Sequence, residues 1–268
     1  MPTNIWVRCK RFTFRTTLPF LAWAIVGCQA VPAPRDALIP ISQISGLSGD
    51  KPAYSEREIK KLARNFVQVV FGRELEDSGQ HLLKWQTPIR LKVWGVQLES
   101  EKEDLLHLLS LLRDITGHDI QLSETKAVNF KVFIQPRFAM LRQFHLETNN
   151  RFRQAPLTNC FGFVSVNREK RELTGASVFI NRDSNSATIA ACLTEEITQG
   201  LGLPNDTNLE VQSVFNDHNI FDNLTYHDAM LVRALYDPRI KTGMNTAELI
   251  PLLLSIMREQ LAEISPKL

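Results

Sequence analysis

Cysteine and histidine are scarce in this chain, and no apolar run is long enough to cross a membrane. Its 268 residues include four cysteines and six histidines. So little cysteine excludes a small disulfide-stapled scaffold, and a composition of 44% hydrophobic and 22% charged residues excludes a disordered or fibrous chain. The longest apolar runs, 18–26 and 249–257, fall short of the roughly 20 residues that a membrane-spanning helix needs.

Several catalytic and nucleotide-binding signatures are also missing. The chain contains no G-x-S-x-G, no phosphate-binding P-loop and no G-x-G-x-x-G. None of its histidines forms an H-x-x-x-H pair. The sequence therefore offers no ready zinc, nucleotide or dinucleotide site, and we expect no cofactor.

Acidic residues are missing from the start of the chain. No acid precedes Asp36, whereas four basic residues lie in the first fifteen positions. The whole chain has 31 basic and 29 acidic side chains, so removal of the basic start leaves 27 against 29, a net charge of −2. A nearly neutral body gives no electrostatic reason to expect nucleic-acid binding.

The first 27 residues have the three parts of a secretory signal peptide: a basic start, a short apolar run and small residues at its end. The end, Ile25-Val26-Gly27-Cys28, resembles the lipobox of bacterial lipoproteins. That resemblance implies cleavage before Cys28 and lipidation of its sulfur. Gln29 is not the aspartate of an inner-membrane retention signal, so the resemblance favours the outer membrane, facing the periplasm. The alternative is an ordinary cleaved signal in which Cys28 has no role.

Residues 28–54 are rich in proline and show no helical period, which predicts an extended tether between lipid and domain. The alternative is a surface strand packed on the domain. We assign residues 55–268 to one folded domain, because a capping box at Ser55 and Glu58 opens the first amphipathic helix there.

Alternating and helical patterns follow one another along residues 55–268, which predicts a single α+β domain. Four segments alternate or carry short apolar runs typical of strands, namely 89–96, 129–135, 161–166 and 176–181. Helical patterns predict helices over 55–71, 100–116, 187–201, 225–236 and 249–264, with Ser100 and Glu103 as a second capping box and a distortion near Pro251.

Two cysteines remain in the body once Cys9 and Cys28 are assigned to the signal and the lipid site. Cys160 precedes a predicted strand, and Cys192 lies early in a predicted helix. An even pair in an oxidising compartment favours a disulfide, and two buried thiols are the alternative. Metal binding by the pair is disfavoured, since no further Cys or His stands at ligand spacing.

The segment CLTEEITQGLGLPND covers residues 192–206. Its spacing Glu195-Glu196-x-x-Gln199-x-x-Gly202-x-x-Asn205 resembles the metzincin motif H-E-x-x-H-x-x-G-x-x-H. The element order before it, a mixed sheet, a long helix and then the motif helix, is similar to the zincin catalytic core. This resemblance implies a zincin-like α+β domain with an active-site-type helix.

A second resemblance uses the same helix together with later motifs. Phe215-Asn216-Asp217 and the run Leu235-Tyr236-Asp237-Pro238, with Gly243-Met244, complete the set. Together they resemble the proteobacterial lipoprotein family catalogued as domain of unknown function 2927, over about residues 55–250.

The departures from the metzincin motif decide the expected chemistry. Glu195 and Gln199 stand where two zinc-binding histidines would be, and Asn205 or Asp206 stands at the third position. Only Glu196 remains, at the general-base position. Zinc catalysis needs three good ligands and an open position for water, so the motif predicts a scaffold without metal. A simpler interpretation is a solvated helix face whose glutamates only set surface charge.

Three functions therefore remain open. We expect a non-catalytic module of the cell envelope, anchored by Cys28, whose zincin-like cleft binds a peptide or an envelope protein. The alternative is a divergent metal-dependent peptidase or hydrolase that uses Glu195, Glu196 and His218. A purely structural lipoprotein is the third. Asp206, Asp217 and Asp222 offer oxygens to a hard cation, but their spacing matches no calcium loop.

Overall fold

The computed structural model describes residues 38–72, 81–95, 98–125, 127–150, 156–209, 211–216 and 221–265. Within this part of the chain the helices are the 3₁₀ turn η2 (Ile41–Gln43), α1 (Glu56–Phe71), α2 (Glu99–Thr116), α3 (Arg137–Glu147), α4 (Ser186–Gln199), α5 (Tyr226–Tyr236) and α6 (Thr246–Ile264). The strands are β1 (Lys84–Trp85), β2 (Ile89–Gly95), β3 (Ile120–Leu122), β4 (Phe130–Gln135), β5 (Cys160–Asn167) and β6 (Glu172–Asn181).

The strands form one mixed sheet in which all pairs except one are parallel. The order β1-β6-β4-β2-β3 runs across it, and β5 pairs antiparallel with β6. Among the described strands β5 has β6 as its single neighbour, so β5 is an edge strand. The α+β class expected from the sequence is confirmed.

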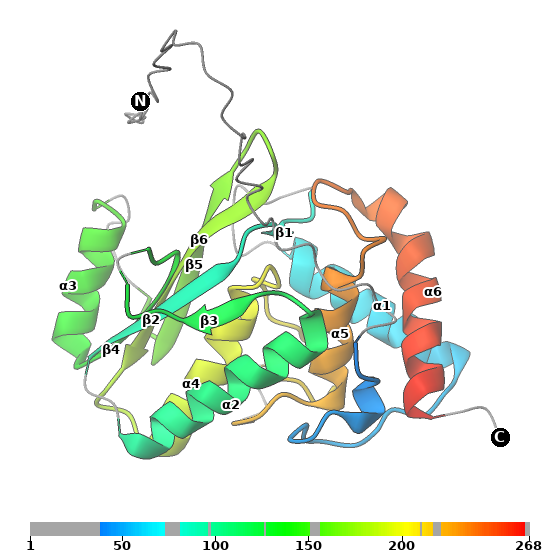
Figure 1. Ribbon diagram of the computed structural model, residues 1–268, viewed down its shortest axis with the longest axis horizontal. Helices are drawn as coiled ribbons and strands as arrows, with labels where there is room; N and C mark the ends of the chain where they lie inside the picture. Colours follow the sequence, from blue (N-terminus) through cyan, green and yellow to red (C-terminus); the bar gives the residue numbers. More distant parts are fainter. Residues whose placement is uncertain are drawn as a thin grey trace, which may run out of the picture.

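Helices cover the two faces of the sheet unequally (Figure 1). Side chains alternate along β5, so Cys160 reaches α4 on one face while Phe161 packs against Phe144 of α3 on the other. The α4 face joins the main hydrophobic core, which continues into α1, α5 and α6. The α3 face holds a smaller aromatic cluster of Phe133, Met140, Phe144, Phe161 and Phe179.

Local sequence explains where most helices begin. The side chain of Ser55 accepts a hydrogen bond from the Glu58 amide at the start of α1, and Thr225 and Asp228 form a capping box at α5. The capping box expected at Ser100 and Glu103 is wrong. Helix α2 begins earlier, because the Glu101 carboxylate reaches back to the Leu98 amide.

The expected strands are all present, but helix α3 and the short strands β1 and β3 were missed. Helix α3 exposes Phe138 and Leu146 while it buries Met140 and Phe144, so its apolar residues lie on both sides and follow no single helical stripe. Strands of two or three residues are too short to show an alternation.

The second half of the expected tether packs on the body. Ile41 and Ile44 are buried in the main core, and Ser48 forms a parallel bridge with Thr225. The tether assignment therefore needs correction for residues 38–54, where two apolar side chains find room against the helical layer. Residues 28–37, the signal 1–27 and Cys28 lie outside the described residues.

In the part of the chain that the structure describes, no helix combines the length and the apolar character needed to cross a membrane.

The burial of Ile41 gives a first prediction. Ile41→Ala should lower the free energy of unfolding by about 2–4 kcal/mol, because it removes a fully buried side chain from the core. Ile39→Ala is the matched control, since Ile39 is 43% exposed, and its effect should stay below about 1 kcal/mol. Urea denaturation of both variants measures the difference, and equal small effects would restore the tether interpretation.

Candidate functional site

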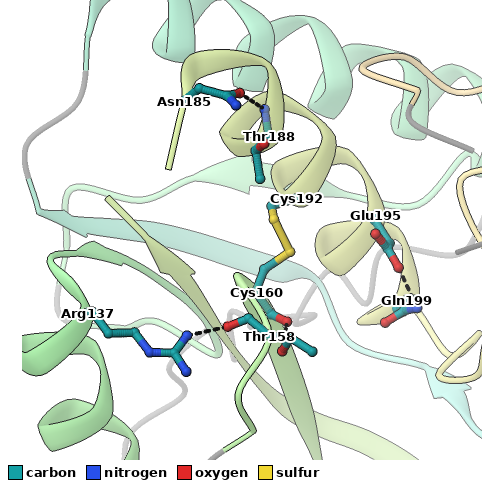
Figure 2. The surroundings of a disulfide bond; sticks show 8 residues. All are labelled: Arg137, Thr158, Cys160, Asn185, Thr188, Cys192, Glu195 and Gln199. Atoms are coloured by element: carbon teal, nitrogen blue, oxygen red, sulfur yellow. Dashed lines mark hydrogen bonds between the residues drawn. A yellow bond between two sulfur atoms is a disulfide. The ribbon is translucent and has the colours of Figure 1, made fainter. Parts of the chain in front are cut away.

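Helix α4 is fastened to the edge strand by the disulfide between Cys160 and Cys192, which confirms that pairing (Figure 2). The two Cα atoms lie 5.8 Å apart. Cross-linking across a loop of this length stabilises a fold by roughly 3–4 kcal/mol in the chain-entropy description. The bond holds the middle of α4 beside the first residue of β5.

Glu196 faces the same strand one turn further along α4. A Cβ placed on Gly162 would lie only 3.1 Å from Glu196 Oε2, so the carboxylate lies against the backbone of β5 at this glycine. Glu196 is buried, whereas Gly162 is exposed. A Cβ at position 162 would require the Glu196 carboxylate to shift by a few tenths of an ångström.

The outer edge of β5 presents backbone groups at alternate residues. The amide of Asn181 in β6 donates to the carbonyl of Asn159 at 2.8 Å, and the strand register pairs Phe161 with Phe179. In an antiparallel ladder every second residue bonds to the partner strand. The odd-numbered residues therefore bond to β6, and the N–H and C=O groups of Gly162 and Val164 point outward.

The remaining motif residues form a polar row along the adjacent side of α4. Gln199 Nε2 donates to Asp206 Oδ1 at 2.8 Å and lies 3.5 Å from Glu195 Oε1 (Figure 2). All three residues are half-buried. Asn205 points elsewhere, since its Nδ2 donates to the Val69 carbonyl at the end of α1. Of the two candidates for the third position, Asp206 is the one that joins the row.

A sharp turn brings Asp206 back to the helix. Helix α4 ends at Gln199, and Gly202 follows with φ of 121°. A Cβ at Gly202 would meet the Leu83 carbonyl oxygen at 2.4 Å, so only glycine fits this left-handed position. The motif glycine therefore serves the turn that returns the chain to the row.

The donor set of the row does not suit zinc. Gln199 turns an amide nitrogen toward both carboxylates, and an amide N–H donates hydrogen bonds but has no lone pair for a metal. Within the described ranges, no three His, Cys, Asp or Glu residues gather at metal-binding distance. Asp217 and His218 lie outside the described residues, while the backbone carbonyl of Asp222 accepts a hydrogen bond from Thr194.

Sequence reasoning missed the burial of the Asp228 carboxylate. Asp228 is fully buried and accepts hydrogen bonds from the Ser213 hydroxyl and from the amides of Val214 and Thr225. It thereby fastens the turn at residues 213–216 to the start of α5. The only sequence signal was the capping box with Thr225, which does not reveal the partner turn.

Two buried histidines have structural roles. Nε2 of His227 lies 2.6 Å from Nδ2 of Asn65 on α1, and burial lowers the pKa of His227 to about 3, so its ring is neutral. His118 pairs through Nε2 with the Thr87 carbonyl at 2.8 Å, and burial also lowers its pKa. Both imidazole rings therefore bond to neighbouring groups of the protein interior.

These features define a mixed α+β protein whose mostly parallel sheet carries an antiparallel edge strand cross-linked to a helix. The chain belongs to the family described as protein of unknown function DUF2927, whose model matches residues 59–255. The matched range begins inside α1 and ends inside α6, so it covers the whole sheet and α4. No curated protein matches the chain.

The burial of Asp228 predicts a specific pH dependence. Burial raises its pKa to about 6, above an unfolded value of about 3.9. The folded protein therefore holds this proton more tightly, so the contribution of Asp228 to stability is full below pH 4 and is lost as the pH rises through 6. In Asp228→Asn this dependence is absent.

Urea denaturation of both proteins between pH 4 and 7 measures the effect. The stability advantage of the unchanged protein over Asp228→Asn should be about 2–3 kcal/mol greater at pH 4 than at pH 7. A difference between the two proteins that stays constant over this range would contradict the assignment.

Proposed function

We propose that this protein is a lipid-anchored module of the cell envelope that binds an extended peptide segment of a partner protein along β5. The observation that carries the proposal is the outer edge of β5, which pairs with no other described strand and where Gly162 and Val164 direct N–H and C=O groups outward. A peptide laid along this edge would become the next strand of the sheet. Main-chain hydrogen bonds would supply affinity, and neighbouring side chains would supply selectivity.

The local shape of the edge favours this mode of binding. Gly162 is exposed and has no side chain, so a second backbone can approach it closely. The disulfide and the Glu196 contact hold β5 against α4 before any partner arrives. A strand that is already ordered loses little conformational freedom on binding, which favours affinity.

The resemblance to zincins supports the same site. The long helix α2 precedes the motif helix α4, and four strands of the mixed sheet, β3 to β6, lie between them together with α3. Zincin cores place a substrate strand along a sheet edge, and strand addition needs no metal. In this proposal the zincin-like shape serves to bind a peptide. Gln199 stands at the position of a zinc ligand and makes hydrogen bonds instead.

The proposed location in the cell envelope depends on residues 1–28. Cleavage before Cys28 and lipidation of its sulfur would tether the body to the outer membrane on its periplasmic side, by multiple acyl chains. The disulfide supports this, because structural disulfides persist in oxidising compartments such as the periplasm. Replacement of Cys28 by serine, followed by fractionation of membranes, tests the anchor.

Val164→Pro tests the strand-addition site. Proline removes the outward N–H of Val164 but none of the hydrogen bonds to β6, and edge strands tolerate proline where the N–H faces solvent. Binding of peptides selected from a random displayed pool should weaken about tenfold, since one main-chain hydrogen bond and close approach are lost. Val164→Ala keeps the N–H and should bind as the unchanged protein does.

Equal peptide binding by Val164→Pro and Val164→Ala would contradict the proposal, as would a pool that yields no binding peptide. The divergent hydrolase would be favoured if the protein, purified without chelators, held one zinc ion per chain and cleaved peptides, and if Glu196→Gln abolished that cleavage.

A further inference from the structure

Helix α3 turns a row of large side chains away from the protein. Phe138, Arg142 and Leu146 are spaced four residues apart, so they share one outward face. Phe138 is 83% exposed and Leu146 is 60% exposed. An ordinary surface helix directs such residues to the core, so this row needs another explanation.

The segment before β5 extends the row at its first turn. The guanidinium of Arg137 donates hydrogen bonds to the carbonyls of Thr158 and Pro156, as Figure 2 shows for Thr158. These bonds hold Leu157 beside the start of α3, where it is 92% exposed. We call Arg137, Phe138, Arg142, Leu146 and Leu157 the α3 surface.

The charge on the α3 surface has one sign. Its two arginines are cationic, and among the described residues Arg142 takes part in no ion pair. The acid nearest the row along α3, Glu147, pairs with Lys131 of β4 at 2.7 Å. The row itself therefore contains no acid, and at the start of α3 the Asp183 carboxylate accepts a hydrogen bond from the Arg137 amide at 2.9 Å.

We propose that the α3 surface rests on the face of an anionic phospholipid bilayer. The three apolar side chains would enter the boundary between headgroups and acyl chains, and Arg142 would bind a lipid phosphate, for which a guanidinium is well suited. Arg137 would keep its hydrogen bonds to Thr158 and Pro156 and add positive charge, which an anionic headgroup layer attracts.

The position of α3 suits a flat partner. Figure 1 shows α3 at the border of the molecule, apart from the other helices and alone on its side of the sheet. No other described helix would have to be displaced for the row to reach a membrane. Because Arg137 joins the start of α3 to the segment before β5, such contact would also orient the body on the bilayer.

Flotation with lipid vesicles tests the proposal on the chain that starts at residue 28 with Cys28→Ser. This chain has no lipid of its own, and the main core lies within residues 41–264. It should float with vesicles of phosphatidylethanolamine and phosphatidylglycerol in a ratio of about three to one, and far less with phosphatidylcholine alone. High salt should weaken the binding.

The double variant Phe138→Glu with Leu157→Glu should reduce the bound fraction about tenfold, and Arg142→Glu should weaken binding to the anionic vesicles. Leu106→Glu is the matched control. Leu106 is 54% exposed on α2, which packs with α4 on the other face of the sheet. This variant should float as the unchanged chain does, and thermal unfolding of all variants checks that they are folded.

Three results would overturn the proposal: no flotation of the unchanged chain, equal binding to both kinds of vesicle, or full binding by the double variant. A dimer in sedimentation that Phe138→Glu converts to monomers, without vesicle binding, would show instead that a second copy covers the row. None of these results depends on whether β5 binds a peptide.

Discussion

The attachment of α4 to β5 is the constraint on which the arrangement of the site depends. As an edge strand, β5 has a hydrogen-bonded neighbour among the described strands on one side only, namely β6. The disulfide between Cys160 and Cys192 adds a covalent link to α4, and Glu196 against Gly162 adds a contact one turn later. With both in place, the free edge of β5 keeps a fixed position relative to the helix that carries the motif.

The motif residues on α4 and in the turn after it make hydrogen bonds and close contacts within the protein. Gly202 still makes the turn that a long helix needs before the chain folds back. Asn205 binds the end of α1 rather than facing the row, and Gln199 holds Asp206. Gln199, Asn205 and Asp206 therefore each take part in a hydrogen bond that stabilises the local structure.

The sequence predicted those parts of the fold whose signal is local. Alternation marked the long strands, caps at Ser55 and Thr225 marked the starts of two helices, and an even number of body cysteines marked the disulfide. The sequence did not predict helix α3, because its exposed Phe138 and Leu146 disturb the helical period. The exposure of these two residues is also the basis of the proposed membrane contact.

Other parts of the structure depend on contacts between distant residues, which no local pattern reveals. Ser213 and Asp228 are 15 residues apart, yet they share a hydrogen bond in the core. Ile41 and Ile44 lie in a proline-rich stretch without helical period, and only the packed body shows that they are buried. Spacing placed Asn205 at the third motif position, with Asp206 one residue on as the alternative, whereas in the structure Asp206 is the residue that bonds to Gln199.

Hydrogen exchange at single amides of β5 tests the central claim most directly. The amides of Phe161 and Phe163 should exchange slowly in the free protein, because they bond to β6, whereas those of Gly162 and Val164 should exchange fast. On addition of a bound peptide, Gly162 and Val164 should become protected as well. Protection of both amides in the free protein, or no change when peptide binds, would contradict an edge that is open for strand addition.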